Sequence, residues 1–390
     1  MKKIIIILVI SILLCFTFST VSVSALDTAK VNLATNAKAS YLCDENCLEE
    51  MYSKNSTKRL PIASMVKIMT ALITLDEIQE GNLKIDEMIT ISETASGMGG
   101  SQMFLDTGLT YPVSDLLKGV IVVSANDACL ALAERISGSE EAFVLKMNEK
   151  ASHLGMSNTN FANCTGLPAP NGYSCAKDVA TMLSRLVKHD LYHNYSTVWL
   201  ENYKHPDGRI TTMTNTNKLI KFYQGCDGGK TGFTNEAMFC LAASAKKGDL
   251  RLISVVIGEQ DSKTRFKESS ELLNYGFANY QNTVFAKQEE VIGKGKVIQG
   301  KQEEVPVGVK ENLGILTKKG NLDKIEKIIE LDEIKAPLSK GDKVGNIFLV
   351  KEDGKILGES ELIALENVEK LTFGDTVRKI FGKWGVCSNN

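Results

Sequence analysis

One short stretch places a possible nucleophile next to a possible base at the start of a helix. Ser64 is followed three residues later by Lys67, and an apolar run with helical periodicity begins there. Side chains three residues apart share a helix face, so the hydroxyl and the amine are expected to lie side by side. A serine becomes nucleophilic when a neighbour accepts its proton, and burial near a helix N-terminus can lower the pKa of a lysine enough for that role. The spacing alone also occurs on many solvent-exposed helices, so it needs further support.

The N-terminal residues predict export from the cytoplasm. Residues 1–3 are basic, residues 4–18 are apolar, and residues 23–25 supply the small side chains that a signal peptidase needs. This pattern predicts a signal peptide over 1–25 that is cut after Ala25, with an uncleaved membrane anchor as the alternative. We therefore expect a protein that is secreted across the cytoplasmic membrane and works on its extracellular face.

Composition limits the classes of protein that remain. The chain is 43% hydrophobic and 24% charged with a formal net charge of -2, and it is long enough for one large domain and a smaller one. The near-neutral charge balance gives no indication of nucleic-acid binding. Cys15 falls in the signal peptide, and the pairs Cys43/Cys47 and Cys164/Cys175 are candidate disulfides in an exported protein.

Two patterns could suggest a metal site, but both are incomplete. The Cys43 to Cys47 spacing lacks a second cysteine or histidine pair, and His189 and His193 lack the glutamate and the third ligand of a zinc protease. The glycine-rich loop over 96–102 matches no phosphate-binding pattern and is expected to allow a close backbone approach. We therefore predict no metal and no organic cofactor.

A second polar motif interrupts a helical region expected over 113–136. Ser124 and Asn126 fall at the break between two apolar helices. Short polar side chains at such a break commonly cap the following helix, and the alternative is that both face a cleft.

The third motif, Lys230-Thr231-Gly232, precedes two segments that read as antiparallel strands. The motif is expected at the start or on the edge of that sheet. Glycine on both sides would let a ligand lie against the strand, while Lys230 and the Thr231 hydroxyl would form a cationic pocket for a carboxylate. An ordinary turn with an exposed lysine is the alternative.

The three motifs, in this order in a secreted chain, form the set found in class A β-lactamases and penicillin-binding proteins. The sequence resembles the serine-type D-alanyl-D-alanine carboxypeptidases, which are low-molecular-mass penicillin-binding proteins of the penicillin-binding protein 5/6 kind, and among them the Bacillus sporulation-associated type. The resemblance covers nearly the whole mature chain, and it includes residues 60–64, 100–105, 126–128, 165–167, 173–174, 178 and 227–232.

The resemblance implies an α+β fold. The first domain, over 26–282, would be β-lactamase/transpeptidase-like: an antiparallel sheet flanked by helices, with the site between them. A small β-rich domain over 283–364 would follow it. The last segment, 365–390, would form an amphipathic helix: Val377, Ile380, Phe381 and Trp384 share one face and basic residues share the other. Such a helix can lie on an anionic membrane surface, and packing of the apolar stripe on the protein is the alternative.

The resemblance also implies a reaction. Ser64 would attack the terminal D-Ala-D-Ala bond of the peptidoglycan stem pentapeptide and form an acyl-enzyme, and water would then release the tetrapeptide. Lys67 would accept the serine proton, Ser124 would relay a proton to the leaving amine, and Asn126 would hold the substrate's peptide group. Penicillins and other β-lactam antibiotics would acylate the same serine.

Substrate binding would fall to the third motif. Lys230, Thr231 and Gly232 would hold the terminal carboxylate, and the backbone N–H groups of Ser64 and Phe233 would form the oxyanion hole. Some relatives have histidine where this chain has Phe233. The replacement puts in doubt a polar role for this side chain, but the backbone N–H donor is unaffected.

Three alternatives remain open. A class A β-lactamase would need a Glu-x-x-x-Asn pattern between the second and third motifs, and the sequence has none there. A D,D-transpeptidase or endopeptidase shares the motifs. An inactive cell-wall-binding module would be expected to have lost a catalytic residue.

Overall fold

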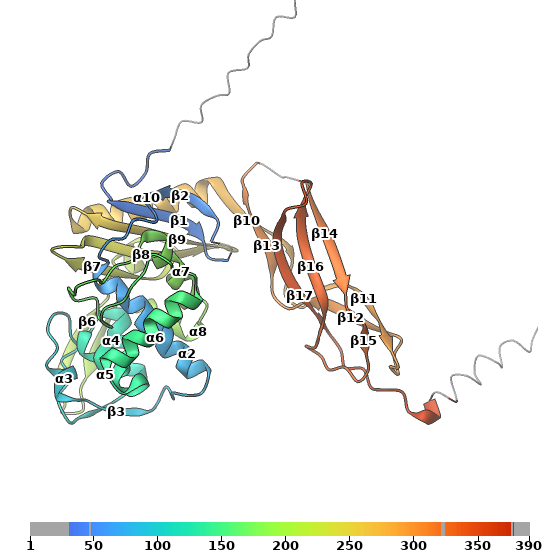
Figure 1. Ribbon diagram of the computed structural model, residues 1–390, viewed down its shortest axis with the longest axis horizontal. Coiled ribbons are helices and arrows are strands. Elements are labelled where there is room, and N and C mark those ends of the chain that lie inside the picture. The colour runs from blue at the N-terminus through green and yellow to red at the C-terminus, as the bar shows by residue number, and fades with distance from the viewer. Residues whose placement is uncertain (1–30, 47, 321–323, 376, 378–390) are drawn as a thin grey trace, which may run out of the picture. The chain divides into compact units, whose positions relative to one another are not determined.

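The computed structural model describes residues 31–46, 48–320, 324–375 and 377 (Figure 1). The predicted signal peptide lies outside these residues, as do residues 376 and 378–390 of the predicted C-terminal amphipathic helix. The helix does not begin at residue 365 as predicted, because Val368 and Lys370 form β-bridges with Leu338 and Gly300. Within the described part of the chain, no helix is long and apolar enough to cross a membrane.

A five-stranded antiparallel sheet forms the centre of the larger part of the chain. Its strand order is β2-β1-β9-β8-β7, so β7, which carries Lys230, Thr231 and Gly232, is an edge strand as the sequence predicts. Most residues of the middle strands β8 and β9 are buried, and most of these are apolar, as expected for a sheet covered on both faces. The strands are β1 (Ala39–Asp44), β2 (Glu50–Lys54), β7 (Cys226–Thr234), β8 (Met238–Lys247) and β9 (Leu250–Glu259).

Helices cover this sheet. Helix α10 (Ser262–Asn279) and helix α7 (Ala176–Leu186) each contact β1, β8 and β9, and Figure 1 shows α10 on one side of the sheet and the other helices on the opposite side. In α2 (Lys67–Gln79) every residue from Lys67 to Leu75 is buried, so this helix runs through the core. The remaining elements of this part are η1 (Ala63–Val66), α3 (Glu93–Ser96), α4 (Val113–Val122), α5 (Asn126–Ser137), α6 (Glu140–His153), α8 (Asp190–Ser196), α9 (Leu219–Phe222) and two pairs of antiparallel strands, β3 (Met88–Thr90) with β4 (Thr110–Pro112) and β5 (Leu200–Lys204) with β6 (Ile210–Thr214).

The rest of the described chain is β-rich, as predicted, and has its own apolar core. Strand β10 pairs with β13, and a six-stranded sheet has the order β14-β16-β17-β12-β11-β15. The strands are β10 (Tyr280–Ala286), β11 (Val291–Ile298), β12 (Glu304–Val309), β13 (Leu313–Lys318), β14 (Ile325–Leu331), β15 (Ile334–Lys335), β16 (Lys343–Lys351) and β17 (Ile356–Ala364).

The structure excludes one of the two interpretations of the second motif and one candidate disulfide. The N-cap of α5 is Ala125 and makes no side-chain capping bond, so neither Ser124 nor Asn126 caps this helix. Cys164 and Cys175 are both free and buried rather than joined. The Cys175 sulfur instead caps α7 and accepts from the Asp178 N–H at 3.5 Å. Cys43 is buried in β1, and its candidate partner Cys47 lies outside the described residues.

Candidate active site

Ser64 and Lys67 lie side by side at the start of the central helix. Ser64 belongs to the short 3-10 turn η1 and Lys67 is the first residue of α2, so the helix begins three residues later than the serine. The Lys67 Nζ lies 3.2 Å from the Ser64 Oγ and donates to the Thr165 carbonyl at 2.6 Å. The backbone of Ala63 has a φ of +48°, an uncommon conformation that sets the direction of this turn. The geometry allows a proton to pass between the hydroxyl and the amine.

The surroundings of Lys67 favour its neutral form. The side chain is 1% exposed. Burial lowers its pKa from the ordinary value of 10.5, and nearby Cys129, Cys164 and Asp127 offset part of this effect. A lysine in this setting can act as a base at a lower pH than an exposed lysine.

Two glycines let neighbouring segments close around the serine turn. A Cβ on Gly166, whose φ is +81°, would lie 2.1 Å from the Ala63 carbonyl oxygen. A Cβ on Gly232 would lie 2.6 Å from the Ile62 carbonyl oxygen and 3.3 Å from the Ser64 nitrogen. Both positions therefore require glycine, and strand β7 and the loop over 158–174 meet at the serine.

Ser124 is held between α4 and α5 in a strained conformation. Its φ is +65°, it is buried, and its Oγ has no hydrogen-bond partner among the described residues. Strained non-glycine residues and unpartnered buried hydroxyls both cluster at functional sites. The hydroxyl is thus available to a ligand group.

Asn126 and Asp127 arrange the glycine-rich loop beside Ser124. The Asn126 Nδ2 donates to the Gly99 carbonyl at 2.6 Å, and a Cβ on Gly100 would lie 2.8 Å from that nitrogen, which is the close approach expected for this loop. Asp127 is fully buried and accepts from the Met103 and Leu105 N–H groups at 3.2 and 3.1 Å. Burial raises its pKa, while the backbone donors oppose that rise.

A buried cluster of cations surrounds the third motif. Lys230 is buried and its Nζ donates to the Thr231 carbonyl at 3.0 Å. Arg265, from α10, donates to the Gly232 carbonyl at 3.2 Å, and its Nε is buried without a partner among the described residues. Burial lowers the pKa of both side chains, to about 10 for Arg265, and the charge of Lys67 adds to the effect on Lys230. An anion bound here would relieve this repulsion.

Phe233 follows this motif and is half exposed. Its ring packs on Phe239 with 4.4 Å between the ring centroids. The side chain offers no polar group to the site.

Three contributors to the site lie outside the three motifs. Arg265 comes from a segment far from Gly232, which it contacts, and no local pattern marks it. Thr165 and Asp127 fall in segments that carry the family resemblance, but the contact of the Thr165 carbonyl with Lys67 and the burial of Asp127 depend on the folded chain.

Comparison with known proteins identifies the family of the chain. The family model described as D-alanyl-D-alanine carboxypeptidase matches residues 25–261, and the model for the C-terminal domain of penicillin-binding protein 5 matches residues 280–370. The D-alanyl-D-alanine carboxypeptidase DacF of Bacillus subtilis is 40% identical over 98% of this chain and 99% of its own. DacC of Escherichia coli is 34% identical, with 90% of each chain covered. Penicillin-binding protein 5 from Haemophilus influenzae aligns with a TM-score of 0.68 at 32% identity, covering 87% of this chain and 99% of its own.

The chain belongs to the D-alanyl-D-alanine carboxypeptidase family of penicillin-binding proteins. It is a serine-type D-Ala-D-Ala carboxypeptidase of peptidoglycan metabolism and acts outside the cytoplasm.

Proposed function

We propose that Ser64 is the nucleophile that attacks the carbonyl of the terminal D-Ala-D-Ala bond of a peptidoglycan stem pentapeptide. The observation that carries this proposal is the 3.2 Å contact between its hydroxyl and the buried amine of Lys67. Lys67 accepts the serine proton as the C–O bond to the substrate forms. Ser124 passes a proton to the departing amine of D-alanine, and Asn126 holds the substrate's peptide group. Water then hydrolyses the acyl-enzyme and releases the tetrapeptide.

The terminal carboxylate of the substrate binds to Lys230 and Thr231, next to Gly232, with Arg265 as a further cation. The proximity of Lys230 and Arg265 supports this role, because a carboxylate compensates two cations that form no ion pair with the described residues. A pocket that needs a free anionic end selects an exopeptidase reaction. The backbone N–H groups of Ser64 and Phe233 form the oxyanion hole, in which each donor commonly contributes about 3 kcal/mol to barrier lowering.

Penicillins acylate Ser64 because their amide and carboxylate imitate the end of the substrate. We propose that this reaction and peptide hydrolysis occur in the domain over 26–282, and that residues 283–364 form a separate spacer or docking domain. Residues 1–25 serve as a cleaved signal peptide. Residues 365–390 associate with the membrane surface, which the face shared by Val377, Ile380, Phe381 and Trp384 supports.

The direct test is D-alanine release from a diacyl-L-Lys-D-Ala-D-Ala peptide by the purified mature protein, with a labelled penicillin in parallel. We expect release that penicillin blocks. Penicillin labelling without release would instead support a D,D-transpeptidase or endopeptidase. Neither signal would support an inactive binding module.

A further inference from the structure

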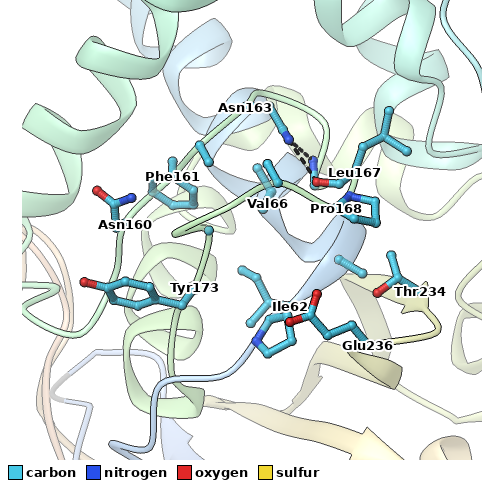
Figure 2. Close-up of a pocket in the computed structure, with 16 residues that line it drawn as sticks. Ile62, Val66, Asn160, Phe161, Asn163, Leu167, Pro168, Tyr173, Thr234 and Glu236 are labelled. Atoms are coloured by element: carbon cyan, nitrogen blue, oxygen red, sulfur yellow. Dashed lines mark hydrogen bonds between the residues drawn. The ribbon is translucent and has the colours of Figure 1, made fainter.

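A pocket adjoins the serine turn (Figure 2). It lies between the loop over 160–173, the residues before Ser64 and the turn after β7. Ala63 and Thr234 are part of its wall, so the pocket is continuous with both the serine turn and the end of β7. The mechanism proposed above assigns no role to it.

The wall of this pocket combines apolar and polar side chains with one charge. Its apolar side chains include Ile62, Val66, Phe161 and Leu167. Among the described residues that line it, Glu236 alone is charged, and this residue is exposed and forms no ion pair with a described residue. Figure 2 shows its carboxylate reaching from the turn after β7 toward the pocket. The loop opposite is held by Asn163, which accepts from the Gly166 N–H at 2.6 Å and donates to the Leu167 carbonyl at 2.9 Å.

The direction of the substrate follows from β7. This edge strand leaves one side open to an extended peptide. With the terminal carboxylate at Lys230 and Thr231 and the scissile bond at Ser64, the upstream residues run toward Thr234 and Glu236, at about 3.3 Å per residue. The residue that precedes D-Ala-D-Ala therefore reaches the pocket.

We propose that this pocket binds the side chain of the residue before D-Ala-D-Ala and that Glu236 recognises a free ammonium group at its end. The apolar side chains of the wall contact the methylene groups of such a side chain, and the carboxylate pairs with the amine. The enzyme then prefers stem peptides whose diamino acid is not yet cross-linked, because cross-linking converts the amine to a neutral amide. The inference rests on the proposed function of the site.

Two tripeptides that differ only at this amine provide the test: Nα-acetyl-L-Lys-D-Ala-D-Ala, and the same peptide with its ε-amine acetylated. D-alanine release gives kcat/KM for each. For the wild-type protein we expect the free amine to be preferred by about two- to fivefold, the range for a solvent-exposed ion pair, and the preference to shrink as salt is added. In Glu236→Gln the ratio is expected to fall to about one.

Glu149→Gln on α6 is the matched control, because it removes an exposed carboxylate away from the pocket and is expected to keep the wild-type ratio. Labelling by penicillin verifies that each variant is folded. The ratio of kcat/KM for the two peptides in the wild-type protein, together with its salt dependence, tests the proposal without any variant. Equal rates for the two peptides, or an unchanged ratio in Glu236→Gln, would overturn the role of Glu236 while leaving the carboxypeptidase reaction intact. Failure to release D-alanine from either peptide would contradict the proposed function itself.

Discussion

Replacement of Glu259 by glutamine is expected to stabilise the protein at neutral pH. Glu259 ends β9, is fully buried, and neither of its carboxyl oxygens has a donor among the described residues. The Glu268 carboxyl lies beside it and already accepts from the Asn36 and Ala37 N–H groups at 3.0 and 3.2 Å. Two carboxyl groups placed side by side can form a hydrogen bond with each other only if one of them carries a proton that the other accepts. Burial, together with Glu268, raises the pKa of Glu259 to about 9, so the proton stays on Glu259. Hydrogen-bond donors including Asn36 lower the pKa of Glu268.

The magnitude follows from linkage. The folded protein holds the Glu259 proton more tightly than the unfolded chain, so the stabilisation is complete below the unfolded pKa of 4.5 and is lost as the pH rises toward about 9. Each pH unit within this window corresponds to about 1.4 kcal/mol, so the free energy of unfolding falls by about 3 kcal/mol from pH 5 to pH 7 through this group. Glutamine cannot ionise, and its amide can donate to Glu268.

Urea unfolding at pH 5, 6, 7 and 8 measures this effect. The advantage of Glu259→Gln over the wild-type protein is expected to grow with pH, while Glu149→Gln, which changes an exposed carboxylate, follows the wild-type curve. Parallel curves for Glu259→Gln and the wild-type protein would refute the shared proton.

Three further predictions concern the site. Gly166→Ala places a Cβ against the Ala63 carbonyl and should slow penicillin acylation by about 100-fold by displacing the serine turn, and an unchanged rate would contradict the close packing. Because burial lowers the pKa of Lys67 and only its neutral form accepts a proton, the acylation rate should rise with pH and level off below pH 10.5, whereas a rate that falls over the same range would exclude this base. Arg265→Gln should reduce kcat/KM for D-alanine release about tenfold or more, and it should have a smaller effect on a peptide that ends in an amide, as stopped assays of both substrates would show.

The features that the sequence could predict are those with a local cause. The neighbouring placement of Ser64 and Lys67 follows from helical spacing, and the position of Lys230 on an edge strand follows from the strand pattern and the flanking glycines. The two-part architecture, with a helix-covered sheet followed by a β-rich part, is implied by the family resemblance.

The features that could not be predicted depend on contacts between distant segments. Lys67 meets the Thr165 carbonyl across 98 positions, and Arg265 reaches Gly232 from α10. The left-handed backbone of Ser124 is imposed by the packing of α4 against α5 rather than by a local preference. The spacing of Cys164 and Cys175 suggests a disulfide, whereas Cys175 caps α7. This capping contact depends on the folded conformation of the chain around Cys175.

Mass spectrometry of the penicillin-labelled mature protein tests the central claim, that Ser64 is acylated, most directly. Trypsin releases residues 60–67 as one peptide in which Ser64 is the only hydroxyl side chain, while Ser124 falls in the separate peptide over 119–135. We predict that the penicillin mass appears on peptide 60–67, and that Ser64→Ala abolishes both this adduct and D-alanine release. An adduct on peptide 119–135, or D-alanine release by Ser64→Ala, would contradict the account.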